Sequence, residues 1–291
     1  MNYRITHRTT YNYAAPVTAS FHAARFEPRR SDGQACGSFS LEVSPPPAVR
    51  KTRSDYFGNS VSFFSIQEVH RRLEVTASSR VSVASGRQPT LSQSTPWEQV
   101  RARFRDPVSP ANVKPYEFCL DSPLLVASAE LADYARQSFA AGTPMLVGVR
   151  ELTNRIFRDF KYDPRATTVA TPLHEVWRKR AGVCQDFAHI GIAALRSLGL
   201  PARYVSGYLR TISRAGMRRL VGADASHAWF AAFCPQHGWL EFDPTNDLLV
   251  GDDHIRVAFG RDFSDVSPLS GILTGGGEHD VRVAVDVEPV E

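Results

Sequence analysis

The sequence has no run of about 18 apolar residues, the length that a membrane-spanning helix requires. Its first 13 residues, MNYRITHRTTYNY, lack the apolar stretch of a secretory signal peptide. Cysteine is scarce and forms no CxxC pair or cluster, its four positions being Cys36, Cys119, Cys184 and Cys234. We therefore expect no disulfide framework, no membrane partner, and a cytoplasmic protein with reduced thiols.

Lysine is also rare, because 30 of the 34 basic residues are arginines. The net charge is only +4, and the basic residues form short clusters without interleaved aromatic residues, which argues against a nucleic-acid-binding surface. A content of 43% hydrophobic and 22% charged residues is ordinary for a globular protein. A chain of 291 residues suffices for one large domain or two ordinary ones.

Residues 1–85 show the period-two alternation of β-strands. In the first segment Tyr3, Ile5 and Tyr11 share one parity, and three more segments, 38–45, 55–66 and 73–83, have similar character. Gly58 and Asn59 stand between apolar runs, which predicts a hairpin. Several short strands without a helical period predict an N-terminal β-sandwich domain.

The rest of the chain predicts an α+β core. Residues 86–120 are rich in proline and are interpreted as a connector with at most a short helix near Trp97. The segment 121–265 is the predicted core, with helices beginning at Thr143-Pro144, at Thr171-Pro172 and near Cys184. Strands follow at 202–209, 226–233 and 239–245. Helices followed by strands, without βαβ alternation, are typical of the α+β class.

Residues 266–291 are predicted as a glycine-rich segment followed by a C-terminal β-strand. The valines from Val281 to Val287 share one parity, which indicates a half-buried strand that needs a sheet edge. We expect this strand to join the N-terminal sheet and the glycine-rich segment to help wall a cleft.

Cys184 is placed where thiol chemistry is favoured. The free N–H groups and the dipole of a first helical turn stabilise a thiolate. A thiol nucleophile also needs a base, and the base needs an orienting group. His227 on one predicted strand and Asp243 near the end of the next supply both if the strands pair. The chain order Cys, His, Asp follows papain-type logic.

Each of these residues also has a structural interpretation. Cys184 could be a small buried apolar residue, His227 a satisfied core histidine, and Asp243-Pro244 a turn. Their joint occurrence in one segment favours a triad. Zinc would need three or four ligands at short spacing, and Cys184, His189 and Cys234 do not provide that pattern. The sequence therefore predicts no metal and no cofactor.

Three sequence blocks resemble the catalytic blocks of the transglutaminase-like superfamily, whose core is papain-like: RAGVCQDFAHIGIAALRSLGLPARYVSGYL, DASHAWFAAF and GWLEFDPTND. The segments MNYRITHRTTYNYAAPVTASFHAARFEPR and DYFGNSV resemble the β-domain that precedes this core in a bacterial subgroup. The resemblance implies that Cys184 is the nucleophile, His227 the general base and Asp243 the orienting carboxylate. It also implies an oxyanion donor at the Cys184 backbone N–H.

Other candidate site residues remain open. The family's second oxyanion donor has no clear match, and Tyr162 is the best candidate. Trp229 shares the parity of His227 and could line the cleft, as could Trp177 and His174 on the preceding helix. Hydrolysis and amine transfer use the same nucleophile, base and orienting group, so the triad does not distinguish the two reactions.

The resemblance implies an enzyme that acts on a peptide or protein substrate through a thioester. We expect an open groove beside Cys184, and therefore a cysteine peptidase or amidase. The alternatives are a protein-glutamine transglutaminase, which must exclude water from the thioester, and a non-catalytic binding or scaffold protein.

Overall fold

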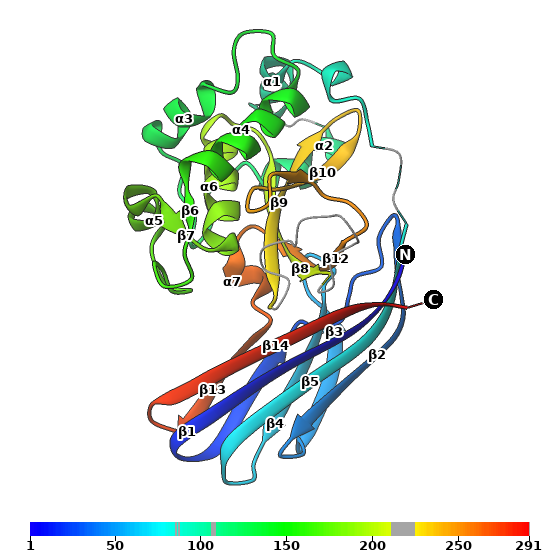
Figure 1. Cartoon of the computed structure of the whole chain (residues 1–291), viewed down its shortest axis with the longest axis vertical. Helices are drawn as coiled ribbons and strands as arrows, with labels where there is room; N and C mark the ends of the chain where they lie inside the picture. The colour runs from blue at the N-terminus through cyan, green and yellow to red at the C-terminus, as the bar shows by residue number, and fades with distance from the viewer. Residues whose placement is uncertain (85, 87, 106–108, 211–224, 291) are drawn as a thin grey trace.

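Figure 1 shows a computed structural model, which describes residues 1–84, 86, 88–105, 109–210 and 225–290. A curled sheet of long strands forms one end of the molecule, and helices packed around a second sheet form the other. No helix in the described part of the chain is both long and apolar enough to cross a membrane.

The first sheet contains seven antiparallel strands drawn from both ends of the chain. They are β1 (Asn2–Ala24), β2 (Gln34–Ser44), β3 (Val49–Ser54), β4 (Ser60–Ile66), β5 (His70–Val83), β13 (Leu269–Gly275) and β14 (His279–Val290). Five lie in the order β2-β5-β1-β4-β3, and β13 and β14 also pair with β1. The prediction that the C-terminal strand joins the N-terminal sheet is confirmed, because β14 pairs with β1 from Asn2↔Val290 to Tyr13↔His279.

The predicted two-sheet sandwich is not observed, because these seven strands form one continuous sheet. The reason is the length of β1, which spans 23 residues. Its first half pairs with β5 and β14 and its second half with β4 and β13, with shifts of register around Val17. The sheet curls, so that Leu73 and Val75 of β5 share one buried cluster with Phe64 of β4. The predicted hairpin is present between β3 and β4, and Gly58 in its turn has φ +75°.

The helices of the other half are α1 (Trp97–Arg105), α2 (Pro110–Glu117), α3 (Ala129–Arg136), α4 (Met145–Asp159), α5 (Leu173–Lys179), α6 (Cys184–Ser197) and the short α7 (Phe263–Val266), with a 3-10 turn η1 (Leu91–Gln93) before α1. The proline-rich segment therefore holds two helices, more than the sequence indicated. Pro110 causes no conflict because it occupies the first turn of α2, where its missing N–H needs no partner. Trp97 and Phe104 of α1 are buried in the main core.

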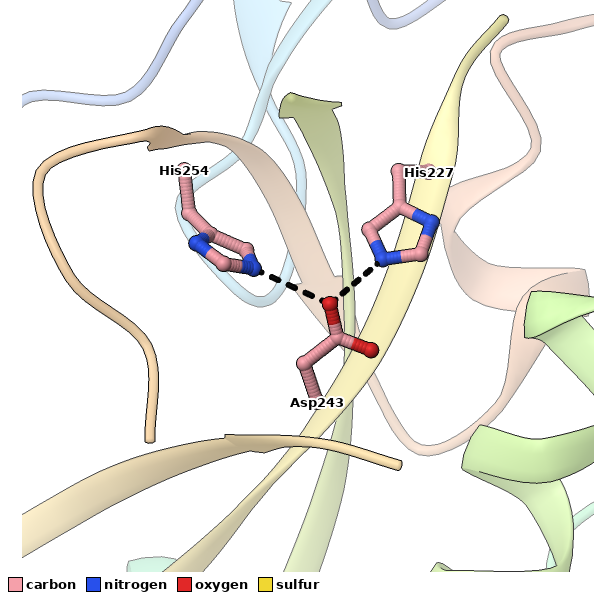
Figure 2. A group of neighbouring side chains, drawn as sticks. All are labelled: His227, Asp243 and His254. Atoms are coloured by element: carbon pink, nitrogen blue, oxygen red, sulfur yellow. Dashed lines mark hydrogen bonds and ion pairs between the residues drawn. The ribbon is translucent and has the colours of Figure 1, made fainter. Parts of the chain in front are cut away.

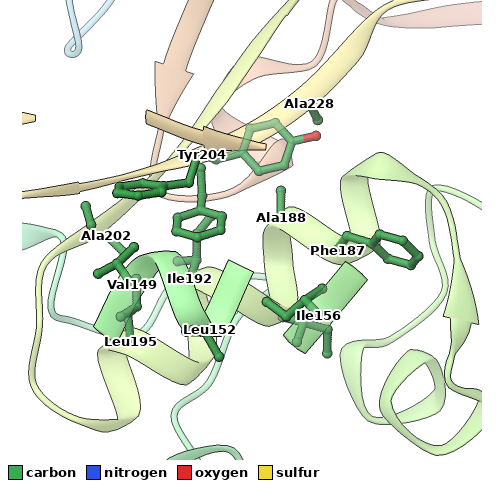
Figure 3. Close-up of a cluster of buried hydrophobic side chains, with 14 of the residues drawn as sticks. Val149, Leu152, Ile156, Phe187, Ala188, Ile192, Leu195, Ala202, Tyr204 and Ala228 are labelled. Atoms are coloured by element: carbon green, nitrogen blue, oxygen red, sulfur yellow. The ribbon is translucent and has the colours of Figure 1, made fainter. Parts of the chain in front are cut away.

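The second sheet has the strand order β11 (Leu248–Leu249), β10 (Gly238–Asp243), β9 (His227–Cys234), β8 (Ala202–Leu209) and β12 (His254–Gly260), and a separate parallel pair joins β6 (Lys161–Tyr162) to β7 (Ala181–Gly182). Helix α6 packs on β8 and β9, and α4 packs beside it and also contacts β9 and β10 (Figure 3). The approach is close at Gly191, where a Cβ would clash with the ring of Phe230. This packing fixes the N-terminus of α6 beside the first residue of β9.

The two halves share one hydrophobic core. Tyr3 and Ile5 of β1 and Val285 and Val287 of β14 are buried in the same cluster as the residues of α4 and α6. The Tyr3 hydroxyl also donates a hydrogen bond to the Asp252 carbonyl over 2.8 Å. The curled sheet is therefore packed firmly against the helical half.

Candidate active site

The segment from Gly182 to Asp186 determines where α6 begins. The Val183 N–H donates to Oδ2 of Asp186 over 2.8 Å, and the Thr167 hydroxyl donates to the same oxygen over 2.6 Å. Gly182 leaves room for this carboxylate, because a Cβ there would clash with it. Cys184 is thus the first helical residue, half-buried, in the turn whose backbone N–H groups have no acceptor within the helix.

His227, the first residue of β9, is fully buried between two of the predicted site residues. Its Nε2 donates to Oδ2 of Asp243 over 2.9 Å (Figure 2). Its Nδ1 completes no hydrogen bond among the described residues, and Cys184 lies close enough to the ring to influence its pKa. Burial lowers the pKa of His227, but Asp243 and Cys184 outweigh that effect and raise it to about 10. Both neighbours therefore favour the protonated form of the imidazole.

Asp243 is held by its own turn as well as by His227. Its Oδ1 accepts the backbone N–H groups of Thr245 (2.9 Å) and Asn246 (3.2 Å), and its Oδ2 accepts the Asn246 side-chain amide over 2.8 Å. Burial opposes ionisation, yet the contacts with His227 and His254 keep the pKa of Asp243 far below its usual range. The motif Asp-Pro-Thr-Asn is thus a turn, as its structural interpretation predicted, and this turn fixes a buried carboxylate next to His227.

His254, the first residue of β12, is a member of this group that the sequence did not reveal. Its Nε2 donates to Oδ2 of Asp243 over 3.1 Å, and the ring is almost completely buried (Figure 2). The edge of Trp229 packs against it at 5.1 Å between ring centroids. Gly207 of β8 makes room for that indole, because a Cβ there would clash with the Trp229 ring.

His227, Asp243 and His254 also meet the simplest requirement for a metal site. One ligand atom from each lies within 4.8 Å of the others in the described part of the chain. The two Nε2 atoms, however, lie at hydrogen-bonding distances of 2.9 and 3.1 Å from the shared oxygen. A metal ion would have to replace both bridging protons. The hydrogen-bond network explains the grouping without one.

A pocket of about 610 Å³ opens over Cys184 and His227. Tyr162 also lines it, because β6 pairs with β7 and sets Tyr162 opposite Gly182, two residues before the cysteine. Burial and the neighbouring Cys184 raise the pKa of Tyr162 to about 12, so its hydroxyl stays protonated. The arrangement brings together a thiol, an imidazole, an oriented carboxylate and a neutral O–H donor.

None of the three cleft-lining candidates lines the pocket over Cys184 itself. Trp229 is fully buried and donates from Nε1 to Glu241 over 2.9 Å, so the prediction that it lines the cleft is wrong. Its parity matches that of His227, but its ring packs with Val205 and Ala231 in a cluster of its own, whereas Ala228 belongs to the main core. Trp177 and His174 line a second pocket of about 500 Å³. The two pockets share Val169 and Gln185 and so adjoin beside Cys184.

Two family models match the chain. Residues 3–82 match the bacterial transglutaminase-like N-terminal region, and residues 132–244 match the transglutaminase-like superfamily. An uncharacterised protein of Mycobacterium tuberculosis is 42% identical, over 99% of this chain and 93% of its own length. A protein-glutamine gamma-glutamyltransferase of Pseudomonas aeruginosa is 32% identical, but over only 40% of this chain and 17% of its own length.

One solved structure resembles the whole chain. A protein from Cytophaga hutchinsonii, provisionally assigned as a cysteine protease, superposes with a TM-score of 0.74 at 23% identity. The match covers 100% of this chain and 92% of that one. At this identity the likeness concerns the fold, including the curled sheet joined to the helical core.

Proposed function

The chain belongs to the transglutaminase-like superfamily, and on that premise we propose that it is a thiol-dependent enzyme that cleaves amide or peptide bonds in a peptide or protein substrate. The observation that carries this proposal is the buried His227, hydrogen-bonded to Asp243 on one side and next to Cys184 on the other. Keeping a charged imidazole fully buried costs free energy unless its partners are retained. A scaffold protein would gain nothing from this arrangement, which favours catalysis over the scaffold alternative.

The proposed reaction begins with attack of the Cys184 thiolate on the amide carbon. The oxyanion that forms is stabilised by the Cys184 backbone N–H and the Tyr162 hydroxyl. His227 then donates its Nδ1 proton to the leaving nitrogen, the C–N bond breaks and a thioester remains. Asp243 keeps the ring oriented and stabilises its charge throughout.

The thioester is proposed to be hydrolysed. Neutral His227 accepts a proton from water, the hydroxide adds to the thioester carbon, and the thiolate leaves, giving a carboxylic acid and the free enzyme. Transfer to an amine would require that water be excluded from the thioester. Trp177 and Trp229 do not line the pocket that holds Cys184, and Val281 and Val283 in its wall are 43% and 44% exposed. An open, solvent-accessible pocket favours a peptidase or amidase.

The alternative is a transglutaminase, which the partial similarity to the Pseudomonas aeruginosa enzyme supports. A cytoplasmic location and a site without metal or cofactor belong to the proposal as well. Incubation with a library of peptides and peptide amides, with and without millimolar alkyl amine, tests it by mass spectrometry. We expect products with the mass of the free acid, absent with Cys184→Ala. Amine-coupled products would favour transfer, and no turnover by the native protein would contradict the proposal.

A further inference from the structure

One face of the β1/β14 ribbon runs continuously from the core to the pocket over Cys184. The register pairs Ile5 with Val287 and His7 with Val285, and these four side chains are buried. The same face continues with Thr9 opposite Val283 and Tyr11 opposite Val281, and all four of these residues line the pocket. The sheet therefore stops contacting the core where the catalytic pocket begins.

The exposure of the valines changes abruptly along this face. Val285 is 4% and Val287 0% exposed, whereas Val283 is 44% and Val281 43% exposed. Exposed valines next to an aromatic side chain form a contiguous apolar patch, and such a patch on a protein surface marks a site where another molecule binds. Because this apolar strip forms a wall of the pocket that contains Cys184, the group that covers it also lies beside the sulfur.

The pocket is also poor in charge. Its lining in the described part of the chain contains no Asp, Glu, Lys or Arg, and besides Cys184 and His227 it includes two further histidines, His7 and His279. His7 in the wall is neutral, because burial lowers its pKa to about 4 and its two nitrogens bond to the Tyr208 and Thr9 hydroxyls over 3.0 Å each. A charged side chain entering this space would lose its hydration without gaining a partner.

We propose that the curled sheet forms part of the substrate site, and that the Thr9, Tyr11, Val281 and Val283 strip binds an uncharged, apolar segment of the substrate peptide next to the scissile amide. This inference rests on the proposed function and adds the substrate class to it. A peptide segment suits the site because the pocket of about 610 Å³ continues past Val169 and Gln185 into the second pocket. A substrate peptide can thus extend to both sides of the Cys184 sulfur, and its part on one of these sides faces the curled sheet.

The test measures how fast Cys184 is alkylated by peptidyl chloromethyl ketones of equal length, which carry leucine or lysine at each position in turn. We expect that, for at least one position in the peptide, the leucine probe reacts about tenfold faster than the lysine probe, or more. Val283→Glu should abolish or reverse that preference, because it supplies a partner for the lysine. Ala284→Glu is the matched control, since Ala284 is the next residue of β14, is exposed, and does not line the pocket.

Val281→Glu gives a second, independent variant, and thermal unfolding verifies that each protein is folded. Iodoacetamide, which is too small to reach the strip, should label Cys184 within about twofold of the native rate in all three variants. If iodoacetamide labels Cys184 but the leucine-to-lysine ratio is near one, or is unchanged by both pocket variants, the inference is overturned and the proposed function stands. If Cys184 reacts with none of the electrophiles, the proposed function fails, and this inference fails with it.

Discussion

His254 donates a hydrogen bond from Nε2 to Oδ2 of Asp243 over 3.1 Å, at the same oxygen that holds the imidazole of His227. Two buried imidazoles thus share one carboxylate oxygen, and His254 is a positioning residue for the other two groups. We predict that His254→Ala lowers kcat by about 10- to 100-fold, the value of a hydrogen bond to a charged group, and leaves KM nearly unchanged.

The conservative variant separates this role from simple packing. His254→Gln retains a side-chain N–H donor and should recover part of kcat. His237→Ala, in an exposed turn, is the matched control and should behave like the native enzyme. Equal losses in His254→Gln and His254→Ala, with equal loss of stability, would assign His254 a packing role only.

The pH profile should depend on Asp243. The carboxylate helps raise the pKa of His227 to about 10, so the imidazolium that protonates the leaving group persists at alkaline pH and is lost as the pH approaches that value. Asp243→Asn removes the negative charge, the pKa of His227 falls, and the alkaline limb of kcat/KM moves to lower pH. A loss of about ten-thousandfold at the optimum accompanies a change of this kind when the imidazole tautomer is no longer fixed. An alkaline limb at the native position would show that another group holds the charge.

Tyr162 should contribute to the oxyanion but not to the nucleophile. Tyr162→Phe removes one hydroxyl donor, and we expect kcat to fall by about 100- to 1,000-fold while iodoacetamide labels Cys184 at the native rate. Tyr56→Phe, on an exposed residue in the turn between β3 and β4, is the control. Native turnover by Tyr162→Phe would leave the backbone N–H of Cys184 as the assigned donor.

Gly207 is predicted to be required for the packing behind the site. A Cβ at this position would clash with the Trp229 ring and the Ile255 carbonyl. Gly207→Ala should therefore lower the free energy of unfolding by about 1–3 kcal/mol, and lower activity because Trp229 supports His254. Gly251→Ala is the matched control, since a Cβ there meets nothing within 4 Å. Urea denaturation of both variants measures the difference, and equal stabilities would mean that the sheet relaxes around the methyl group.

The local patterns of the sequence predicted most elements of the fold. Period-two alternation identified the strands, and the valine parity in β14 identified its buried face, because both depend only on neighbouring residues. The sandwich prediction failed because strand periodicity is the same in two stacked sheets and in one curled sheet. What decides between them is the pairing of β1 with four partners, which no local pattern encodes.

The residues of the candidate site also fall into two groups, those that local sequence patterns indicate and those that only the tertiary fold brings to the site. Cys184 could be proposed as a candidate from the helix start and its flanking blocks, and His227 and Asp243 from neighbouring strands. His254 follows Asp243 by 11 residues but reaches it only because β12 pairs with β8 and not with β10. Val281 and Val283 look the same in sequence as Val285 and Val287, since the point where the core ends is set by the docking of the sheet.

The central claim is that Cys184 is the nucleophile, and its reactivity relative to the other thiols tests this most directly. Burial raises the pKa of Cys119 to about 12 and raises that of Cys36, so neither supplies much thiolate near neutral pH. Native protein treated with limiting iodoacetamide at pH 7, followed by peptide mapping, should carry the label on Cys184 first, and His227→Asn should slow that labelling by about tenfold or more. Preferential labelling of Cys36, Cys119 or Cys234, or labelling of Cys184 that is indifferent to His227, would contradict the account.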